Sequence, residues 1–96
     1  MDLKELKIKM EAQGELPEQN SEDVLNVCEM ELGNTQKLVF SLSEYRGKQY
    51  FDIRTWYQDD SGAWKPTKKG IRTSMERLDE FMDAAQVLRL ARDLGK

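Results

Sequence analysis

Histidine is absent from this 96-residue sequence, and cysteine occurs only once, as Cys28. The missing histidine removes the most common metal ligand and the usual general base of enzymes. A single cysteine cannot form a disulfide within the chain, which favours a reducing compartment such as the cytoplasm or the nucleus. We also find no phosphate-binding glycine loop, no metal-ligand spacing and no isolated pair of carboxylates. We therefore predict a protein that is not an enzyme and that has no catalytic residue, metal site or cofactor.

Long apolar runs are lacking too. No stretch approaches the ~20 apolar residues of a membrane span, and the opening Met1-Asp2-Leu3-Lys4 is not typical of a secretory signal. Charged residues make up 34% of the chain, so we expect no association with a membrane. A chain of this length forms one domain. Its own core is modest, which makes oligomerisation a natural supplement to stability.

The charges are unevenly distributed, although the formal net charge is only -3. Residues 1–35 contain nine acidic residues and three lysines, whereas residues 36–73 contain eight basic residues and four acidic ones. Residues 74–96 contain five acidic and four basic residues. The overall acidity argues against a nucleic-acid ligand, but the basic middle segment also carries the Trp and Tyr residues. That segment is therefore the candidate site.

The first 23 residues differ in composition from the rest of the chain. They are rich in acidic residues and turn formers, and only Leu3–Met10 suggests a brief helix. We interpret residues 1–23 as an acidic, mobile N-terminal arm and residues 24–96 as the folded domain.

Four segments of this domain have the pattern of strands, and short turns separate them. The segments are Val27–Leu32, Lys37–Tyr45, Lys48–Gln58 and Trp64–Thr73, with turns at Gly33-Asn34, Arg46-Gly47 and Asp59-Asp60-Ser61-Gly62. The first segment could instead be a helical turn. Pro66 cannot donate a ladder hydrogen bond, so the last strand is expected to be an edge strand or to contain a bulge.

Alternation along the two central strands predicts which side chains share a face. One face is mostly apolar and carries Leu38, Phe40, Leu42, Phe51, Ile53, Thr55 and Tyr57. The opposite face carries Lys37, Val39, Ser41, Ser43, Tyr45, Lys48, Tyr50, Asp52, Arg54 and Trp56. We expect Leu38, Phe40, Leu42, Phe51 and Ile53 to form the core.

The residues that follow the last strand have the pattern of a helix. Thr73 with Glu76, or Ser74 alone, would cap its start. One apolar stripe contains Met75, Leu78, Phe81, Met82 and Ala85, and a second contains Val87, Leu90, Ala91 and Leu94. One short sheet can cover only one stripe, and a second copy of the chain is the simplest cover for the other. The predicted fold is thus α+β, in the order β-β-β-β-α, as a homodimer.

If the helix covers the apolar face, the opposite face presents aromatic rings among cations. Such a surface suits single-stranded nucleic acid, because unpaired bases stack on flat side chains at ~1–3 kcal/mol per base. The cations would follow the phosphates and displace counterions. A duplex hides its base faces, so exposed rings without a recognition helix favour the single strand.

Several of these residues have a purely structural alternative. Trp56 could be a core residue, and Tyr45 could pin the turn as a cross-strand partner. Tyr50 and Trp64 are more typical of packing, and the facing of Tyr57 stays open because it lies near a strand end. The lysines from Lys65 to Lys69 could simply guard an edge strand against aggregation. Asp52 is expected to pair with Arg54 and orient it.

One ordered motif is more specific than the charge pattern. It reads Tyr45-Arg46-Gly47-Lys48, Phe51-Asp52-Ile53-Arg54, Gly62, Lys65-Pro66 and Lys68-Lys69-Gly70-Ile71. It resembles the single-stranded DNA-binding domain of the transcriptional positive cofactor four (coactivator) family. Eukaryotic members read aromatic-Lys-Gly-Lys, Asp-Ile-Arg and Lys-Pro-Gly-Arg-Lys-Gly-Ile at the same intervals. The resemblance extends from about Lys37 to the end of the helix.

The resemblance implies a homodimer in which each chain gives a curved four-stranded antiparallel sheet and a C-terminal helix at the two-fold interface. It also implies that the aromatic residue before the hairpin glycine, Tyr45, stacks on a base. Strand alternation and the resemblance together give the expected nucleic-acid-binding set: Lys37, Tyr45, Arg46, Lys48, Arg54, Trp56, Tyr57, Lys65, Lys68 and Lys69.

The sequence departs from the family pattern at three places. Tyr57 occupies the position of the family's DNA-contacting tryptophan, whereas tryptophan lies one residue earlier, at Trp56, so both rings remain candidates. Thr67 replaces a family glycine. The acidic arm lacks the serine-rich regulatory region of eukaryotic members, so control by phosphorylation is not implied.

The leading hypothesis is a largely sequence-independent single-stranded DNA binder that acts in transcription, replication or repair, in the manner of a transcription coactivator. RNA is the alternative ligand. The alternative function is a dimeric protein-interaction module that keeps the fold without the DNA role. The expected location is cytoplasmic and nucleoid-associated for a prokaryotic or viral protein, and nuclear for a eukaryotic one.

Overall fold

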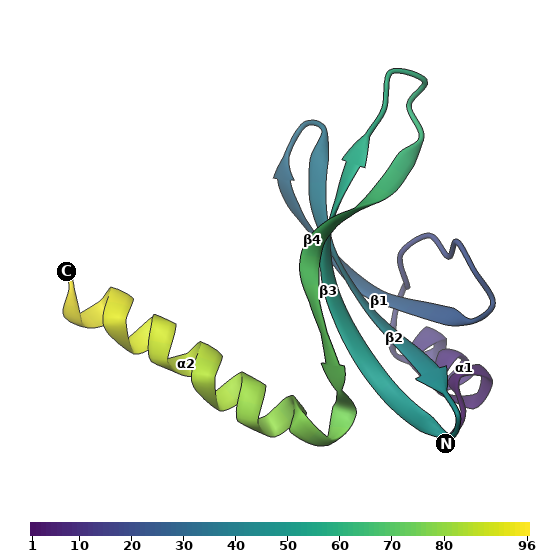
Figure 1. Cartoon of the computed structure of the whole chain (residues 1–96), viewed down its shortest axis with the longest axis horizontal. Helices are drawn as coiled ribbons and strands as arrows, with labels where there is room; N and C mark the ends of the chain where they lie inside the picture. Colours follow the sequence, from purple (N-terminus) through teal and green to yellow (C-terminus); the bar gives the residue numbers. More distant parts are fainter.

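The computed structural model describes all 96 residues. Its elements are α1 (Leu3–Gln13), β1 (Val24–Gly33), β2 (Gln36–Tyr45), β3 (Lys48–Gln58), β4 (Trp64–Ser74), the short 3-10 helix η1 (Met75–Arg77) and α2 (Leu78–Leu94). The four strands form one antiparallel sheet in the order β1-β2-β3-β4, and the sheet is twisted and curved (Figure 1). A four-stranded antiparallel sheet followed by a C-terminal helix confirms the predicted α+β fold.

The hairpin between β2 and β3 has the two-residue turn that the sequence predicted. Arg46 and Gly47 both have positive φ, at 51° and 77°, and Tyr45 pairs directly with Lys48. A turn with two left-handed residues matches the twist of its flanking strands, which is why it connects them so tightly. The turn therefore fixes the backbone of the hairpin tip at one end of the sheet.

The predicted strand bounds agree closely with the structure at β2, β3 and β4. β1 begins at Val24, three residues before the predicted start, and the alternative of a helical turn there is wrong. β4 is an edge strand and also carries a bulge, because its register with β3 shifts between the pairs Arg54–Gly70 and Trp56–Pro66. Both readings of Pro66 are thus correct.

The register of the central strands agrees with the predicted faces. Leu42 pairs with Phe51 and Phe40 with Ile53 on one face, and Ser41 pairs with Asp52 on the other. Phe51 contacts Phe81 of α2 in an edge-to-face arrangement, with ring centroids 5.2 Å apart. We therefore name the face that contains Phe51 the helix-side face, and the face that contains Asp52 the open face.

The core is smaller than the sequence predicted. Only Leu25, Val39, Asn26 and Phe51 are buried. The other four expected core residues are half-buried: Leu38, Phe40, Leu42 and Ile53. Val39 was assigned to the open face and is nevertheless buried there. The predicted core is less buried than expected because α2 covers little of the helix-side face of the curved sheet.

Helix α2 packs on the sheet only near its start and then extends away from it (Figure 1). The predicted Ser74 cap belongs to η1, which leads into α2: Ser74 Oγ accepts a hydrogen bond from the Glu76 N–H at 3.2 Å. α2 itself begins after Arg77, which makes no side-chain cap bond. No residue of α2 is buried. The expectation that the first apolar stripe packs on the sheet holds in part: its other four members are half-buried, whereas Met82 is 47% exposed. The second stripe is exposed at Val87, Leu90 and Leu94, and so is Leu88.

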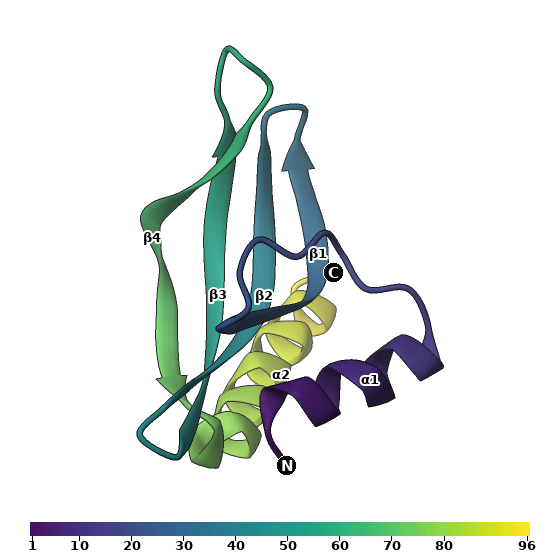
Figure 2. The same ribbon diagram turned by 90° about the vertical axis from the view of Figure 1, so that its right-hand side faces the viewer.

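The N-terminal segment contains more structure than the brief helix that was predicted, since α1 continues to Gln13. The residues after α1 are bonded to β1. The Gln19 amide accepts a hydrogen bond from the Asn26 N–H and donates one to the Asn26 carbonyl, at 2.9 and 2.8 Å. The buried Asn26 side chain donates to the Glu18 carbonyl and to Asn20 Oδ1. Figure 2 shows this segment crossing β1 on the side opposite α2. The mobility of residues 1–23 stays a prediction.

Candidate nucleic-acid interface

The hairpin tip carries an exposed ring between two cations. Tyr45 is 57% exposed, and the Arg46 guanidinium carbon lies 5.1 Å from the centre of its ring. Lys48 is exposed and pairs with Tyr45 across the turn, on the open face. Neither Arg46 nor Lys48 forms an ion pair. The tip thus offers a flat ring with two uncompensated positive charges beside it.

A second pair of a ring and a cation lies next to the tip. The Arg72 guanidinium carbon lies 5.0 Å from the centre of the Tyr50 ring, and Arg72 pairs with Asp52 on the open face. Sequence reasoning did not include Arg72 in the site. The signal was present, because Gly70, Arg72 and Ser74 alternate along β4 on the same face as Arg54.

The middle of the open face contains the predicted pair of Asp52 and Arg54. Arg54 Nε and Nη2 donate to the two oxygens of Asp52 at 3.1 and 3.0 Å, and Nη1 donates to the Thr67 carbonyl at 3.1 Å. The hydrogen bond with Asp52 raises the pKa of the Arg54 guanidinium. The prediction that Asp52 orients Arg54 is confirmed. The positive charge of Arg54 is largely compensated by Asp52, unlike the charges of Arg46 and Lys48 at the hairpin tip.

Lys37 lies at the far end of the open face and is engaged by its neighbours. Its Nζ is 2.8 Å from Glu29 Oε2 and 4.4 Å from the centre of the Trp64 ring. Its side chain is only 14% exposed. Trp56 pairs directly with Lys37 and is half-buried. Trp56 is therefore partly exposed on the open face, and the Lys37 ammonium lies over the ring of Trp64 as the Arg46 guanidinium does over Tyr45.

Tyr57 and Lys65 pair with each other on the helix-side face. Tyr57 is 39% exposed, and Lys65 Nζ lies 3.1 Å from Asp59 Oδ2. Hydrogen bonds from the Ser61 hydroxyl, from Lys65 and from the Ala63 N–H hold the pKa of Asp59 well below its usual value. The bond with Asp59 in turn raises the pKa of Lys65. Trp56 and Tyr57 thus present their rings on opposite faces of β3.

The two remaining lysines of the predicted set, Lys68 and Lys69, lie in the bulge of β4. Both are exposed, and neither takes part in an ion pair. They lie on the edge strand beside Arg54 and contribute two more uncompensated charges.

The structure thus separates the predicted set into two groups along the sheet. Tyr45, Arg46 and Lys48 gather at the hairpin tip, together with the unpredicted Arg72. The bulge lysines and Trp56 lie farther along, and Lys48 and Trp56 are eight residues apart on β3, or about 26 Å at the usual rise of a strand. Tyr57 and Lys65 are not brought to this face. A flexible chain of several nucleotides could span the open face.

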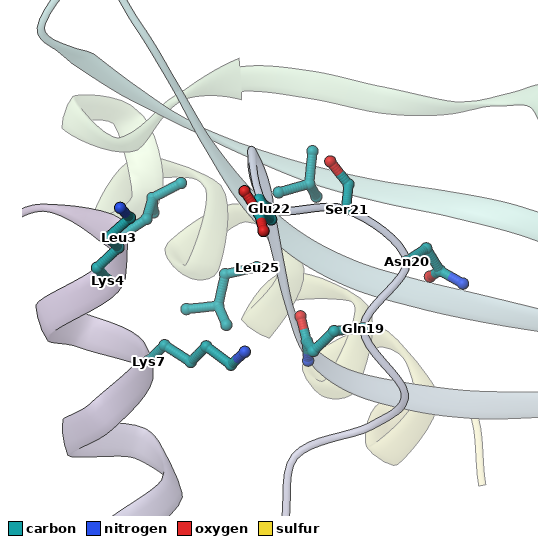
Figure 3. A pocket seen from close by; sticks show the side chains of 9 residues that line it. Leu3, Lys4, Lys7, Gln19, Asn20, Ser21, Glu22 and Leu25 are labelled. Carbon is teal, nitrogen blue, oxygen red and sulfur yellow. The ribbon is translucent and has the colours of Figure 1, made fainter.

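A hollow of about 560 Å³ separates α1 from the segment that leads into β1 (Figure 3). Lys7 of α1 points toward Leu25 and Gln19 across it. Its lining combines two lysines, two amides, one hydroxyl and one carboxylate with three apolar side chains. In the whole chain no group of His, Cys, Asp and Glu side chains is arranged to hold a metal ion. Neither helix combines the length and the apolar character that crossing a membrane would need.

Comparison with known proteins gives matches in sequence and in fold. No curated protein matches the chain. The structure resembles that of BPSL1147, a PC4 homologue from Burkholderia pseudomallei, in two crystal forms. The orthorhombic form has a TM-score of 0.65 at 24% identity and covers 74% of this chain and 96% of the other. The tetragonal form has a TM-score of 0.64 at 26% identity and covers 69% and 97%. A bacteriophage T5 homologue of the eukaryotic coactivator PC4 aligns with a TM-score of 0.48 at 24% identity, covering 72% and 96%.

The model of one protein family, the transcriptional coactivator p15 (PC4), matches residues 32–84. These residues include the hairpin tip, the pair of Asp52 and Arg54, the bulge of β4 and the start of α2. The family is known for DNA binding and transcription coactivation. The match spans more than half of the chain and confirms the resemblance found in the sequence, so this chain belongs to the transcriptional coactivator p15 (PC4) family.

Proposed function

We propose that this protein binds single-stranded DNA with little sequence preference, and that it does so as a homodimer in transcription, replication or repair. The observation that carries the proposal is the exposed ring of Tyr45, which lies beside the uncompensated charges of Arg46 and Lys48 on the open face. A ring of this kind can stack on an unpaired base, and the two cations can contact the flanking phosphates.

Trp56 is the second stacking ring that we propose, in preference to Tyr57. Trp56 shares the open face with Tyr45 and Lys48, whereas Tyr57 lies on the helix-side face. A strand that follows the open face would meet Tyr45 first, then Arg72 and the bulge lysines, and then Trp56. Lys37, Arg54 and Lys65 already have carboxylate partners, so their contribution to phosphate binding is expected to be smaller.

A fluorescence anisotropy titration with labelled oligo-dT tests this proposal. We expect micromolar or tighter binding that weakens steeply as salt is added, since each phosphate contact contributes about -0.7 to the slope of log K against log salt. Tyr45→Ala should weaken binding by about 1–3 kcal/mol. The matched control Tyr45→Phe keeps a ring and should bind almost as tightly. An absence of binding at low salt would refute the proposal, and competition with oligo-rU would decide between DNA and RNA.

The homodimer is proposed because α2 leaves apolar side chains without a partner. Val87, Leu88, Leu90 and Leu94 are each at least 55% exposed on one helix of a 96-residue chain. An apolar stripe of this kind usually marks an interface. Sedimentation equilibrium should give twice the chain mass, and Leu90→Glu should shift the protein toward the monomer. A monomeric unsubstituted protein at micromolar concentration would contradict this part of the proposal.

The alternative, a protein-interaction module without a DNA role, has one observation in its favour. Lys37, Arg54 and Lys65 each bind a carboxylate of the same chain, which lowers the positive potential of the surface. This alternative predicts that Tyr45→Ala leaves the activity of the protein unchanged. It also predicts that the affinity of this protein for oligo-dT is no higher than that of an unrelated protein of the same net charge.

A further inference from the structure

The bulge of β4 is held by a set of hydrogen bonds that involve side chains of β3 and β4. Between the pairs Arg54–Gly70 and Trp56–Pro66 the chain advances two residues on β3 but four on β4. The extra residues leave the regular ladder, as in other β-bulges. Lys68 and Lys69 lie within this bulge, and both are exposed.

Thr67 is the residue that bonds this bulge to β3. Its hydroxyl donates to the Thr55 carbonyl at 2.7 Å and accepts from the Lys69 N–H at 3.1 Å. Its carbonyl accepts from Arg54 Nη1 at 3.1 Å. One residue thereby satisfies backbone groups that the shifted register leaves without ladder partners.

Arg54 is held in place for this contact. Three of its five N–H donors are used, two by Asp52 and one by the Thr67 carbonyl. Gly70 lets β4 come close at the same point, since a Cβ atom there would lie 2.8 Å from the Ile53 carbonyl oxygen and 2.9 Å from Arg54 Cα. Three contacts therefore hold the bulge in place: the hydrogen bond from Arg54, the hydrogen bonds of the Thr67 hydroxyl, and the close backbone packing at Gly70.

We infer that Thr67 and Arg54 act as positioning residues that aim Lys68 and Lys69 at the phosphates of a bound single strand. The inference rests on the proposed function. It gives Arg54 the role of a support for the bulge instead of a primary phosphate ligand. It also gives the Thr67 hydroxyl a role that a glycine at this position could not have.

Thr67→Val tests the inference, because it keeps the branched shape of the side chain and removes only the hydroxyl. We expect oligo-dT binding to weaken, with a salt slope that becomes shallower by about 0.7 to 1.4 per chain, which corresponds to one or two lost phosphate contacts. Thr67→Ser restores a hydroxyl and should restore the slope. Arg54→Lys keeps the charge but not the fork of donors, and it should reproduce the effect of Thr67→Val if the valine variant does not fold.

A double-mutant cycle separates positioning from a general loss of stability. If Thr67 acts through the lysines, Thr67→Val should have no further effect on binding when Lys68 and Lys69 are already replaced by Ala. Additive losses in that background would overturn the inference, and so would an unchanged slope in a folded Thr67→Val protein that binds oligo-dT. If the unsubstituted protein does not bind oligo-dT at all, the proposed function fails, and the inference fails with it. If the unsubstituted protein binds oligo-dT and only the tests on Thr67 fail, the inference alone is overturned.

Discussion

Replacing Arg46 by Asn should make the protein more stable and a poorer DNA binder. Arg46 has a φ of 51°, a left-handed conformation that costs an L residue with a Cβ atom roughly 1–2 kcal/mol, whereas Asn adopts it more readily. With Gly47 at 77°, Asn at this position would give the Asn-Gly pair that two-residue hairpin turns prefer. We therefore expect Arg46→Asn to raise the free energy of unfolding by about 1 kcal/mol per chain.

The expected effect on binding has the opposite sign. The guanidinium of Arg46 lies beside the exposed ring of Tyr45, at the tip where we propose that the first base stacks. Its loss should make the slope of log K against log salt shallower by about 0.7 per chain. If the left-handed conformation of Arg46 had no role in binding, Arg46→Asn would raise the free energy of unfolding without weakening DNA binding.

The assay combines thermal unfolding at equal protein concentrations with oligo-dT titrations over a series of salt concentrations. In a domain of this size about 1 kcal/mol corresponds to a rise in Tm of about 4–8 °C. Arg46→Lys is the matched control, because it keeps both the charge and the cost of the left-handed conformation, and it should leave both quantities nearly unchanged. A variant Arg46→Asn that is no more stable would refute the reasoning on strain. An unchanged salt slope would refute the phosphate contact.

Three further substitutions test other parts of the structure. Gly70→Ala should lower the free energy of unfolding by about 1–3 kcal/mol, since the new Cβ would lie 2.8 Å from a backbone carbonyl oxygen of β3; an unchanged midpoint in urea would show that β4 can move aside. The depressed pKa of Asp59 means that its contribution to stability is present above the ordinary carboxyl pKa of about 3.9 and is lost as the pH falls below it. Asp59→Asn should therefore be less stable than the unsubstituted protein at pH 7, and urea titrations should show this difference shrinking in acid; a constant difference would count against the bonds that the Asp59 carboxylate accepts from Ser61, Lys65 and Ala63. Glu29→Gln removes the carboxylate beside Lys37 and should tighten oligo-dT binding by up to about fivefold, as expected for a partly exposed pair, whereas weaker binding in the anisotropy assay would mean that the pair positions the lysine.

The parts of the fold that the sequence predicted well are those with strong local signals. Alternation in β2 and β3 gives the correct faces, and the Arg46-Gly47 turn gives their register. Pro66 indicates both an edge strand and a bulge, because a missing N–H restricts it to such places. The pairing of Asp52 with Arg54 follows from their spacing of two on one strand, which places both side chains on one face.

The parts that could not be predicted depend on contacts between distant segments. The buried Asn26 is bonded to Glu18, Gln19 and Asn20, and β1 starts at Val24 because Val24 and Leu25 pair with β2; no periodicity indicates these contacts. Lys37 of β2 lies between Glu29 of β1 and the ring of Trp64 in β4. This contact among three strands could not be predicted from the sequence either. The core was over-predicted because apolar alternation identifies a face but does not show how far a helix covers it.

The central claim is that unpaired bases stack on the rings of the open face. The most direct measurement is a titration with oligo-dT that follows tryptophan fluorescence in a Trp64→Phe protein, in which Trp56 is the remaining tryptophan. We predict a change that saturates, that salt reverses, and that a duplex of the same length does not produce. Binding without any change at Trp56, or no binding at all at low salt, would contradict this account.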